Sequence, residues 1–183
     1  MKIVLIVGLI LIGTFVVFVI VKSRTPKAKA NPEIYYDLRN RVFSLDPDSI
    51  GIKTENGKVY CVVMDFAVGE TPVTLVSFLD GSTSLYFGNG GGVIGCGEHE
   101  NVKKATLELI QHANLDKNKL EETTDYSVSI GKDESRIYML TPSTNYQTKA
   151  LRMNALMENK EVLSGLFIKA NDVVTQIRLT GKI

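Results

Sequence analysis

The sequence predicts an α+β fold, in which an N-terminal transmembrane helix precedes one small domain with a mostly antiparallel five- or six-stranded sheet packed by helices. Two observations lead to this class. Residues 3–21 form an almost purely apolar run. From residue 31 onwards, segments of helical periodicity alternate with short β-like apolar runs. The 183 residues therefore divide into a transmembrane anchor (1–21), a basic juxtamembrane linker (22–30) and a single α+β domain (31–183).

The apolar run is long enough to span a bilayer. As a helix, residues 3–21 extend about 28 Å, close to the hydrocarbon thickness of about 30 Å. Four cations follow within eight residues: Lys22, Arg24, Lys27 and Lys29. The positive-inside rule therefore predicts a single-pass protein of the cell membrane with a cytoplasmic C-terminal domain. A cleaved signal peptide is the alternative, because residues 28–30 resemble a cleavage site, but the long apolar run and the intervening cations disfavour it.

Charge and cysteine content exclude two classes of protein. Two cysteines are too few for a disulfide scaffold. Five of the 21 Lys and Arg residues precede residue 31, whereas all 20 Asp and Glu residues follow it, so the domain carries a net charge of −4. Nucleic-acid binding requires clustered positive charge, and we therefore expect no nucleic-acid partner.

The first half of the domain predicts a helix and a three-strand meander. Residues 31–33, Asn-Pro-Glu, are a helix start, and Asp46-Pro47 ends the element. The expected apolar face of this helix is Ile34, Leu38, Val42 and Leu45. Three β-like runs follow, residues 59–66, 73–79 and 85–87, and an Asp-Gly turn at 80–81 favours a tight hairpin. Asp65 interrupts the first run, and we expect a strand edge facing water there, with a buried ion pair as the alternative.

The second half predicts a helix at 98–113, a hairpin at 126–130 and 135–141, and a helix carrying Tyr146, Ala150, Met153 and Met157. Residues 171–180 fit either a helix or a strand, and we expect helix to about residue 169 and then a strand. This order of elements is similar to roadblock, longin and profilin-type domains, small modules often used for protein association. That resemblance favours an interaction role, although a fold does not determine a function.

The most unusual segment is the glycine-rich crossing between the third strand and the next helix. Residues 90–95 read GGGVIG, and GEH follows at 97–99. This string resembles one found in an uncharacterised bacterial protein family. The resemblance covers about 25 residues, from 85 to 109, and implies no activity or ligand.

The same glycines partly match a nucleotide-binding loop. Gly90, Gly92 and Gly95 have GxGxxG spacing, but the preceding strand belongs to a meander, and Glu98 and Glu100 would repel a phosphate. We therefore expect a flexible sheet-to-helix crossing and no cofactor. If the loop does bind a small ligand, the candidate cofactor-binding residues are Gly90, Gly91, Gly92 and Gly95.

Cys96 and His99 are the candidate catalytic residues. A thiol near a helix N-terminus is activated by the helix dipole, and a histidine three residues later can act as its base. The flanking glutamates oppose this activation. Cys61 and His112 would have to complete a zinc site, but the closely spaced second pair typical of zinc sites is missing, and we expect no metal.

These observations predict a membrane-anchored protein with a small non-catalytic interaction or scaffold domain. Its expected partners are the lipid bilayer, through residues 3–21, and a protein partner or a second copy of the chain. The alternatives are a thiol-dependent or hydrolytic enzyme, or a small-ligand sensor, using the glycine-rich loop 88–99. Neither alternative has a nucleophile, a base and an orienting group that the sequence places together.

Overall fold

A computed structural model describes residues 31–128 and 130–181 of the chain. Within them, eight strands form one sheet in the order β4-β3-β2-β1-β6-β7-β5, and β8 also pairs with β6. The strands are β1 (Cys61–Val68), β2 (Thr71–Phe78), β3 (Thr83–Phe87), β4 (Gly92–Val93), β5 (Glu121–Glu122), β6 (Glu134–Leu140), β7 (Asn145–Gln147) and β8 (Leu151–Arg152). The helices are α2 (Pro32–Phe43), α3 (Glu100–Asp116), α4 (Met153–Met157) and α5 (Ser164–Leu179).

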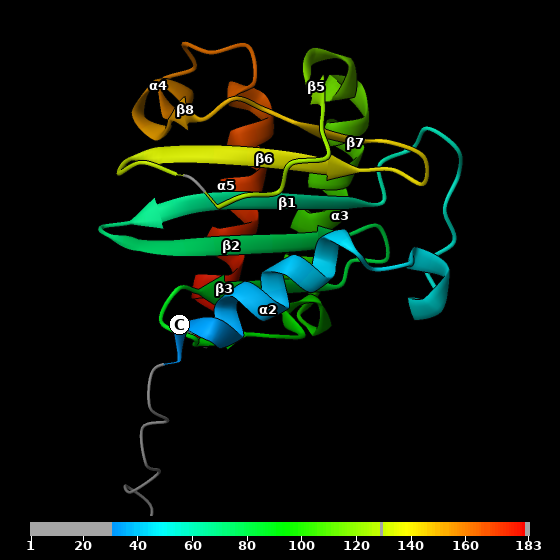
Figure 1. Ribbon diagram of the computed structural model, residues 1–183, viewed down its shortest axis with the longest axis horizontal. Coiled ribbons are helices and arrows are strands. Elements are labelled where there is room, and N and C mark those ends of the chain that lie inside the picture. Colours follow the sequence, from blue (N-terminus) through cyan, green and yellow to red (C-terminus); the bar gives the residue numbers. More distant parts are fainter. Residues whose placement is uncertain (1–30, 129, 182–183) are drawn as a thin grey trace, which may run out of the picture.

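The sheet separates two layers of helix. Figure 1 shows α2 crossing one face, with α3 and α5 behind the other. All strand pairs of the described residues are antiparallel. The predicted α+β class and mostly antiparallel sheet are confirmed, but the sheet has eight strands instead of five or six. The additional strands are two or three residues long, too short for a period-two pattern to reveal them.

Helix α2 begins as predicted but turns a different face to the sheet. The Asn31 side chain accepts a hydrogen bond from the Glu33 amide at 3.1 Å, and Pro32 occupies the first turn. The buried residues are Tyr35, Arg39 and Val42, whereas Ile34 is 45% exposed. Of the predicted apolar face, Val42 is buried and Leu38 packs against the core, but the prediction is wrong at Ile34. Tyr35 and Arg39 take its place, because their side chains make buried polar contacts with the sheet.

The predicted three-strand meander is confirmed. β2 pairs with β1 on one side and β3 on the other, and Gly81 takes φ +88° in the Asp80-Gly81 turn. Residues of β1 alternate between the two cores: Val62 packs on the α3 and α5 side, and Val63 on the α2 side. Asp65 also faces α2 and is fully buried, so the expected water-facing edge is wrong, since β1 is an inner strand flanked by β2 and β6.

The C-terminal half departs most from prediction. Residues 126–128 and 130 form no strand, and the expected helix over 146–157 is reduced to α4, preceded by β7 and β8. The expected final strand is wrong, because α5 continues to Leu179. Val173 and Ile177 are buried one helical turn apart, while Leu179 is 75% exposed. The strand-like alternation of apolar residues in 171–180 therefore contains the buried face of a helix.

No helix within residues 31–128 and 130–181 is sufficiently long and apolar to cross a bilayer. The predicted anchor (1–21) and linker (22–30) lie outside the described residues. Helix α2, with Asn31 as its N-cap, is the first element of the described residues.

Candidate functional site

The glycine-rich loop packs tightly against backbone from other parts of the chain. Gly90 has φ +88°, and a Cβ atom there would lie 2.0 Å from the Asn31 carbonyl oxygen. At Gly97, a Cβ atom would lie 2.1 Å from the Gly81 carbonyl oxygen. Only glycine permits such approaches, so these two positions join the loop to the start of α2 and to the β2–β3 turn.

The other predicted cofactor-binding glycines differ in their surroundings. A Cβ atom on Gly92 would lie 2.8 Å from the Leu85 carbonyl oxygen, because Gly92 pairs with β3. Gly95 has φ +73° and precedes the 3₁₀ turn Cys96–Glu98. Gly91 is exposed, and its amide donates to the Asn89 side chain at 2.9 Å. Chain geometry alone therefore accounts for glycine at 90, 92 and 95.

The two predicted catalytic residues differ in burial. Cys96 is fully buried, packs in the core on the α3 and α5 side, and donates to the Val93 carbonyl oxygen at 3.6 Å. His99 precedes α3 and is half-buried; its Nε2 has no hydrogen-bond partner among the described residues. A thiol in an apolar core meets a substrate only if the loop opens.

The four residues considered for zinc do not gather. Cys61 belongs to the core on the α2 side of the sheet, whereas Cys96 belongs to the opposite core. His112 Nε2 lies 3.4 Å from an Asp116 oxygen, one helical turn along α3. In the part of the chain that the structure describes, no three His, Cys, Asp or Glu side chains are placed to hold a metal ion.

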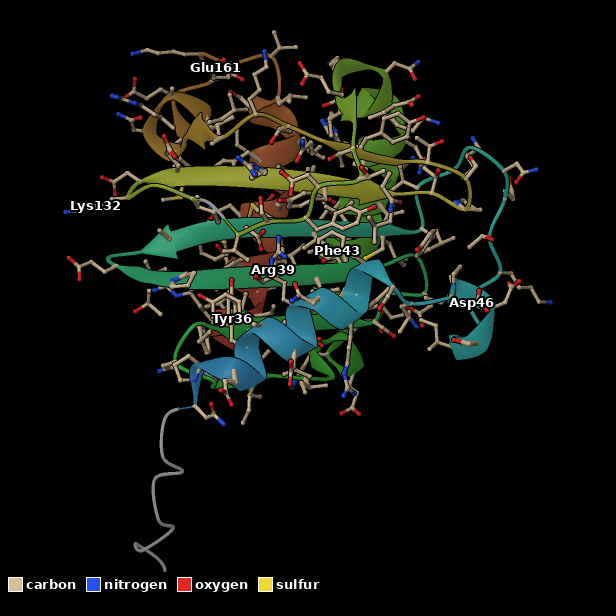
Figure 2. The ribbon with its side chains drawn as sticks, viewed as in Figure 1. Tyr36, Arg39, Phe43, Asp46, Lys132 and Glu161 are labelled. Atoms are coloured by element: carbon tan, nitrogen blue, oxygen red, sulfur yellow. The ribbon has the colours of Figure 1, made fainter. Side chains whose placement is uncertain are left out.

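A buried polar cluster joins α2 to the sheet. The Arg39 Nε atom donates to both Asp65 oxygens, at 3.1 and 3.0 Å, and Thr74 donates to the same carboxylate at 2.6 Å. The Tyr35 hydroxyl lies 2.9 Å from the Thr74 hydroxyl, and Arg39 Nη1 donates to the Tyr126 carbonyl oxygen at 2.7 Å. Figure 2 shows Arg39 pointing from α2 towards the sheet. The bonds satisfy both buried charges, which indicates a structural role.

Ionisation in this cluster is stable over the physiological range. Burial by itself lowers the pKa of Arg39, but the hydrogen bond and charge of Asp65 raise that pKa more, to a net increase. Burial raises the pKa of Tyr35 to about 12. The guanidinium therefore remains charged and the phenol neutral, and neither is poised for proton transfer near pH 7.

A cavity of about 620 Å³ opens at the C-terminal end of α2. Three segments and Tyr60 meet there, the segments being residues 43–47, residues 122–126 from β5 onwards, and the β6–β7 turn at 141–145. Figure 2 labels Phe43 and Asp46 along the first of them. The volume lies within the range of about 300–1,000 Å³ typical of ligand sites.

The cavity wall consists of hydroxyls, carboxylates and aromatic rings. The hydroxyl groups come from Ser44, Thr123, Thr124, Thr141, Ser143 and Thr144. Asp46 and Glu122 supply the carboxylates, and Phe43, Tyr60 and Tyr126 the rings. None of the described lining residues is Cys, His, Lys or Arg. This wall offers hydrogen bonds and negative charge, which suit a neutral or cationic ligand better than an anion.

No family model, curated protein or solved structure matches this chain. The resemblance of residues 85–109 to an uncharacterised bacterial family therefore stays a prediction. The function proposed below is argued from the geometry of the described residues.

Tyr60 is the most distinctive group in the cavity wall. Its side chain is 6% exposed, and its hydroxyl forms no hydrogen bond with the described residues. Burial, with smaller contributions from nearby groups that include Tyr126 and Asp46, raises the pKa of Tyr60 to about 12. Tyr60 therefore presents a neutral phenol, an unused donor, beside two other residues of the wall.

Sequence reasoning missed this cavity, and it gave a buried ion pair at Asp65 only as the alternative, without Arg39 as the partner. The cavity had one visible signal, the hydroxyl-rich segments at 123–124 and 141–144, which are typical of turns and gave no reason to join them. The ion pair had only Asp65 itself, an acid within an apolar strand. Its partner lies 26 residues away in another element, and only the folded chain brings the two together.

Proposed function

We propose that this chain is a single-pass membrane protein whose cytoplasmic α+β domain binds a protein partner at the cavity, without catalysis. The apolar run at 3–21 and the cations after it support the tether and its orientation. The glycine-rich loop acts in this proposal as a structural crossing that joins β3, the start of α2 and α3.

The cavity wall is the observation that carries this proposal. Nucleophilic catalysis needs a nucleophile and a base within hydrogen-bond reach of one another and of a substrate. The described lining residues provide hydroxyls and carboxylates but neither thiol nor imidazole, whereas Cys96 is buried in the core on the other face of the sheet. Such a wall suits equilibrium binding.

The edges of the sheet support the cavity as the docking position. β4 and β5, the two ends of the strand order, are each two residues long. A partner that adds a strand to an edge needs a longer row of free amides and carbonyls. A partner therefore gains more specific contacts in the cavity than along either edge.

Site-specific photocrosslinking of the full-length chain in its native membrane tests this proposal. A photoreactive side chain replaces Thr124, an exposed cavity residue, or Lys132, which Figure 2 shows at the opposite end of the view from Asp46. We expect one discrete protein adduct from position 124 and none from position 132. Equal labelling from both positions, or no adduct from either, would overturn the proposal.

A second variant separates binding from the thiol-enzyme alternative. Cys96→Ala removes the only thiol of the glycine-rich loop. We expect the adduct from position 124 to persist in this variant at wild-type yield. Loss of the adduct in a variant that retains its fold by circular dichroism would favour a reaction that depends on Cys96.

A further inference from the structure

We infer that the cavity binds a basic peptide segment of the partner, with a Lys or Arg side chain at Asp46 and Glu122 and backbone groups at Tyr60. This inference rests on the proposed function and specifies the chemistry of the partner. Charge, a phenol donor that opens onto the cavity and the shape of the opening each support it.

The negative charge of the cavity wall favours a cationic ligand group. Asp46 and Glu122 both line the cavity, and the described lining residues include no Lys, Arg or His that would neutralise them. The neighbouring Glu121 differs, because its carboxylate lies 3.5 Å from Lys149 Nζ. A phosphate or carboxylate ligand would meet only negative charge in the cavity, whereas an ammonium or guanidinium group would form charge-assisted hydrogen bonds.

The Tyr60 hydroxyl favours a ligand that carries a hydrogen-bond acceptor next to its cationic group. Its side chain is more than nine-tenths buried, yet its hydroxyl is unpartnered among the described residues. This oxygen is not among the fully buried unpaired polar atoms of the described residues, so it opens onto the cavity, where a bound acceptor can take its hydrogen bond. A peptide carbonyl is such an acceptor, and amide groups of the same peptide can pair with the threonine and serine hydroxyls of the wall.

The opening admits a chain instead of enclosing a small molecule. Glu122, Thr124, Pro142 and Ser143 line the cavity and are all exposed, so the cavity is continuous with the protein surface. A peptide can therefore place one side chain in the cavity while its flanking residues lie along the exposed rim. A free amine of similar charge would form no hydrogen bond with the Tyr60 hydroxyl, because an ammonium group has no acceptor.

Fluorescence anisotropy with defined peptides tests the inference. The full-length chain is placed in nanodiscs of zwitterionic lipid, so that the lipid does not attract cations. The probe is the labelled peptide Gly-Lys-Gly-Arg-Gly, blocked at both ends, and the comparison peptide has Gln in place of Lys and Arg. We expect the basic peptide to bind at least about tenfold more tightly than the neutral one. Equal affinity would overturn the inference.

Adjacent glutamates supply a matched pair of variants. Glu122→Gln should weaken binding of the basic peptide about five- to tenfold, whereas Glu121→Gln should change it less than about twofold. Tyr60→Phe should weaken both peptides by a similar factor, because the lost bond is to the backbone. Equal effects of the two glutamate variants, or spermidine binding as tightly as the basic peptide, would overturn the inference.

The two proposals fail in different ways. If the basic peptide does not bind but the photocrosslink from position 124 persists, the peptide inference is wrong and the binding function stands. If the crosslink is also absent, the proposed function is wrong as well.

Discussion

Arg39 of α2 and Asp65 of β1 form an ion pair in which both side chains are almost completely buried, at 0% and 1% exposure. Three hydrogen bonds run from the guanidinium to the carboxylate, and a fourth runs from Arg39 to the Tyr126 carbonyl oxygen. One side chain therefore joins α2, a central strand and the segment that leads from β5 to β6. The pair therefore fixes α2, the first described helix, to the sheet.

Asp65→Ala should destabilise the protein by about 3–5 kcal/mol, because it leaves the Arg39 charge buried and unpaired. The double variant Arg39→Met with Asp65→Ala should be less destabilised than Asp65→Ala alone. Urea unfolding of the full-length chain in detergent, followed by circular dichroism, measures both. Arg41→Ala, at an exposed position of the same helix, should stay within about 0.5 kcal/mol of wild type. A large effect of the control would show that the helix as a whole is sensitive.

Gly97→Ala should destabilise the protein by about 1–3 kcal/mol, because its Cβ atom would overlap the Gly81 carbonyl oxygen. Gly91→Ala is the control within the same loop: its nearest contact would be the movable Asn89 side chain, at 3.1 Å, and we expect less than about 1 kcal/mol. Thermal unfolding of the two variants compares them. Equal stability of both variants would contradict a structural role for the loop glycines.

Both cysteines should resist alkylation in the folded protein. Cys61 and Cys96 are fully buried, and burial also raises the pKa of the Cys61 thiol well above its usual range. Iodoacetamide at pH 8, read out by mass spectrometry, should modify them at least about a thousandfold more slowly than in urea, because access requires local opening. Fast modification of Cys96 in the native protein would support the thiol-enzyme alternative.

Stability should decrease between pH 10 and pH 12. The folded protein holds the pKa of Tyr35 and Tyr60 at about 12, mainly through burial, against an ordinary value of 10. In this range the unfolded phenols ionise while the folded ones stay protonated, so the native state binds more protons and each tyrosine removes about 1.4 kcal/mol of stability per pH unit. The contribution of both is complete below pH 10. Tyr60→Phe should therefore make the alkaline loss less steep.

The free energy of unfolding in urea, measured at pH 9, 10, 11 and 11.5, gives this slope. Tyr36→Phe, which changes an exposed tyrosine of α2, is the matched control. A reduction of the slope that is the same in both variants would show that burial of Tyr60 is not its cause.

Membrane topology can be tested independently of the fold. Alkaline phosphatase fused after Ile183 should be inactive, and a cytoplasmic reporter at the same position active, if the cations after residue 21 keep the domain in the cytoplasm. The measurement is enzyme activity of the two fusions at equal expression. An active phosphatase fusion would reverse the proposed orientation.

Elements with strong local signals could be predicted from the sequence. The start of α2 was recognisable because Asn31 and Pro32 act on their own neighbours, and the β1–β2–β3 meander because its turns are closed by adjacent residues. The short strands β7 and β8 could not be predicted, because they exist only as partners of β6. The β6 amide of Ile137 even pairs with the Thr148 side chain between them.

For the candidate site, the sequence directed attention to Cys96 and the loop glycines. Gly90 of that loop packs against Asn31, at the start of α2, whereas the cavity lies at the other end of this helix. Residue chemistry made the thiol conspicuous, but burial removes it from solvent. Asp46, Tyr60 and Glu122 are individually ordinary, and they come from three separate segments. They form a candidate site only because the fold brings them together, and no local sequence pattern predicts that.

The sequence by itself determined the α+β class, the order of the first elements, and the apolar run and charge asymmetry that predict a tether. These depend on interactions between near neighbours and on composition. The tertiary structure alone decided which face of α2 is buried, that α5 continues to Leu179, and where the cavity lies. The reason is that a long-range contact such as that of Arg39 with Asp65 can outweigh local apolar periodicity. Leaving a buried charge unpaired costs more free energy than leaving an isoleucine side chain exposed.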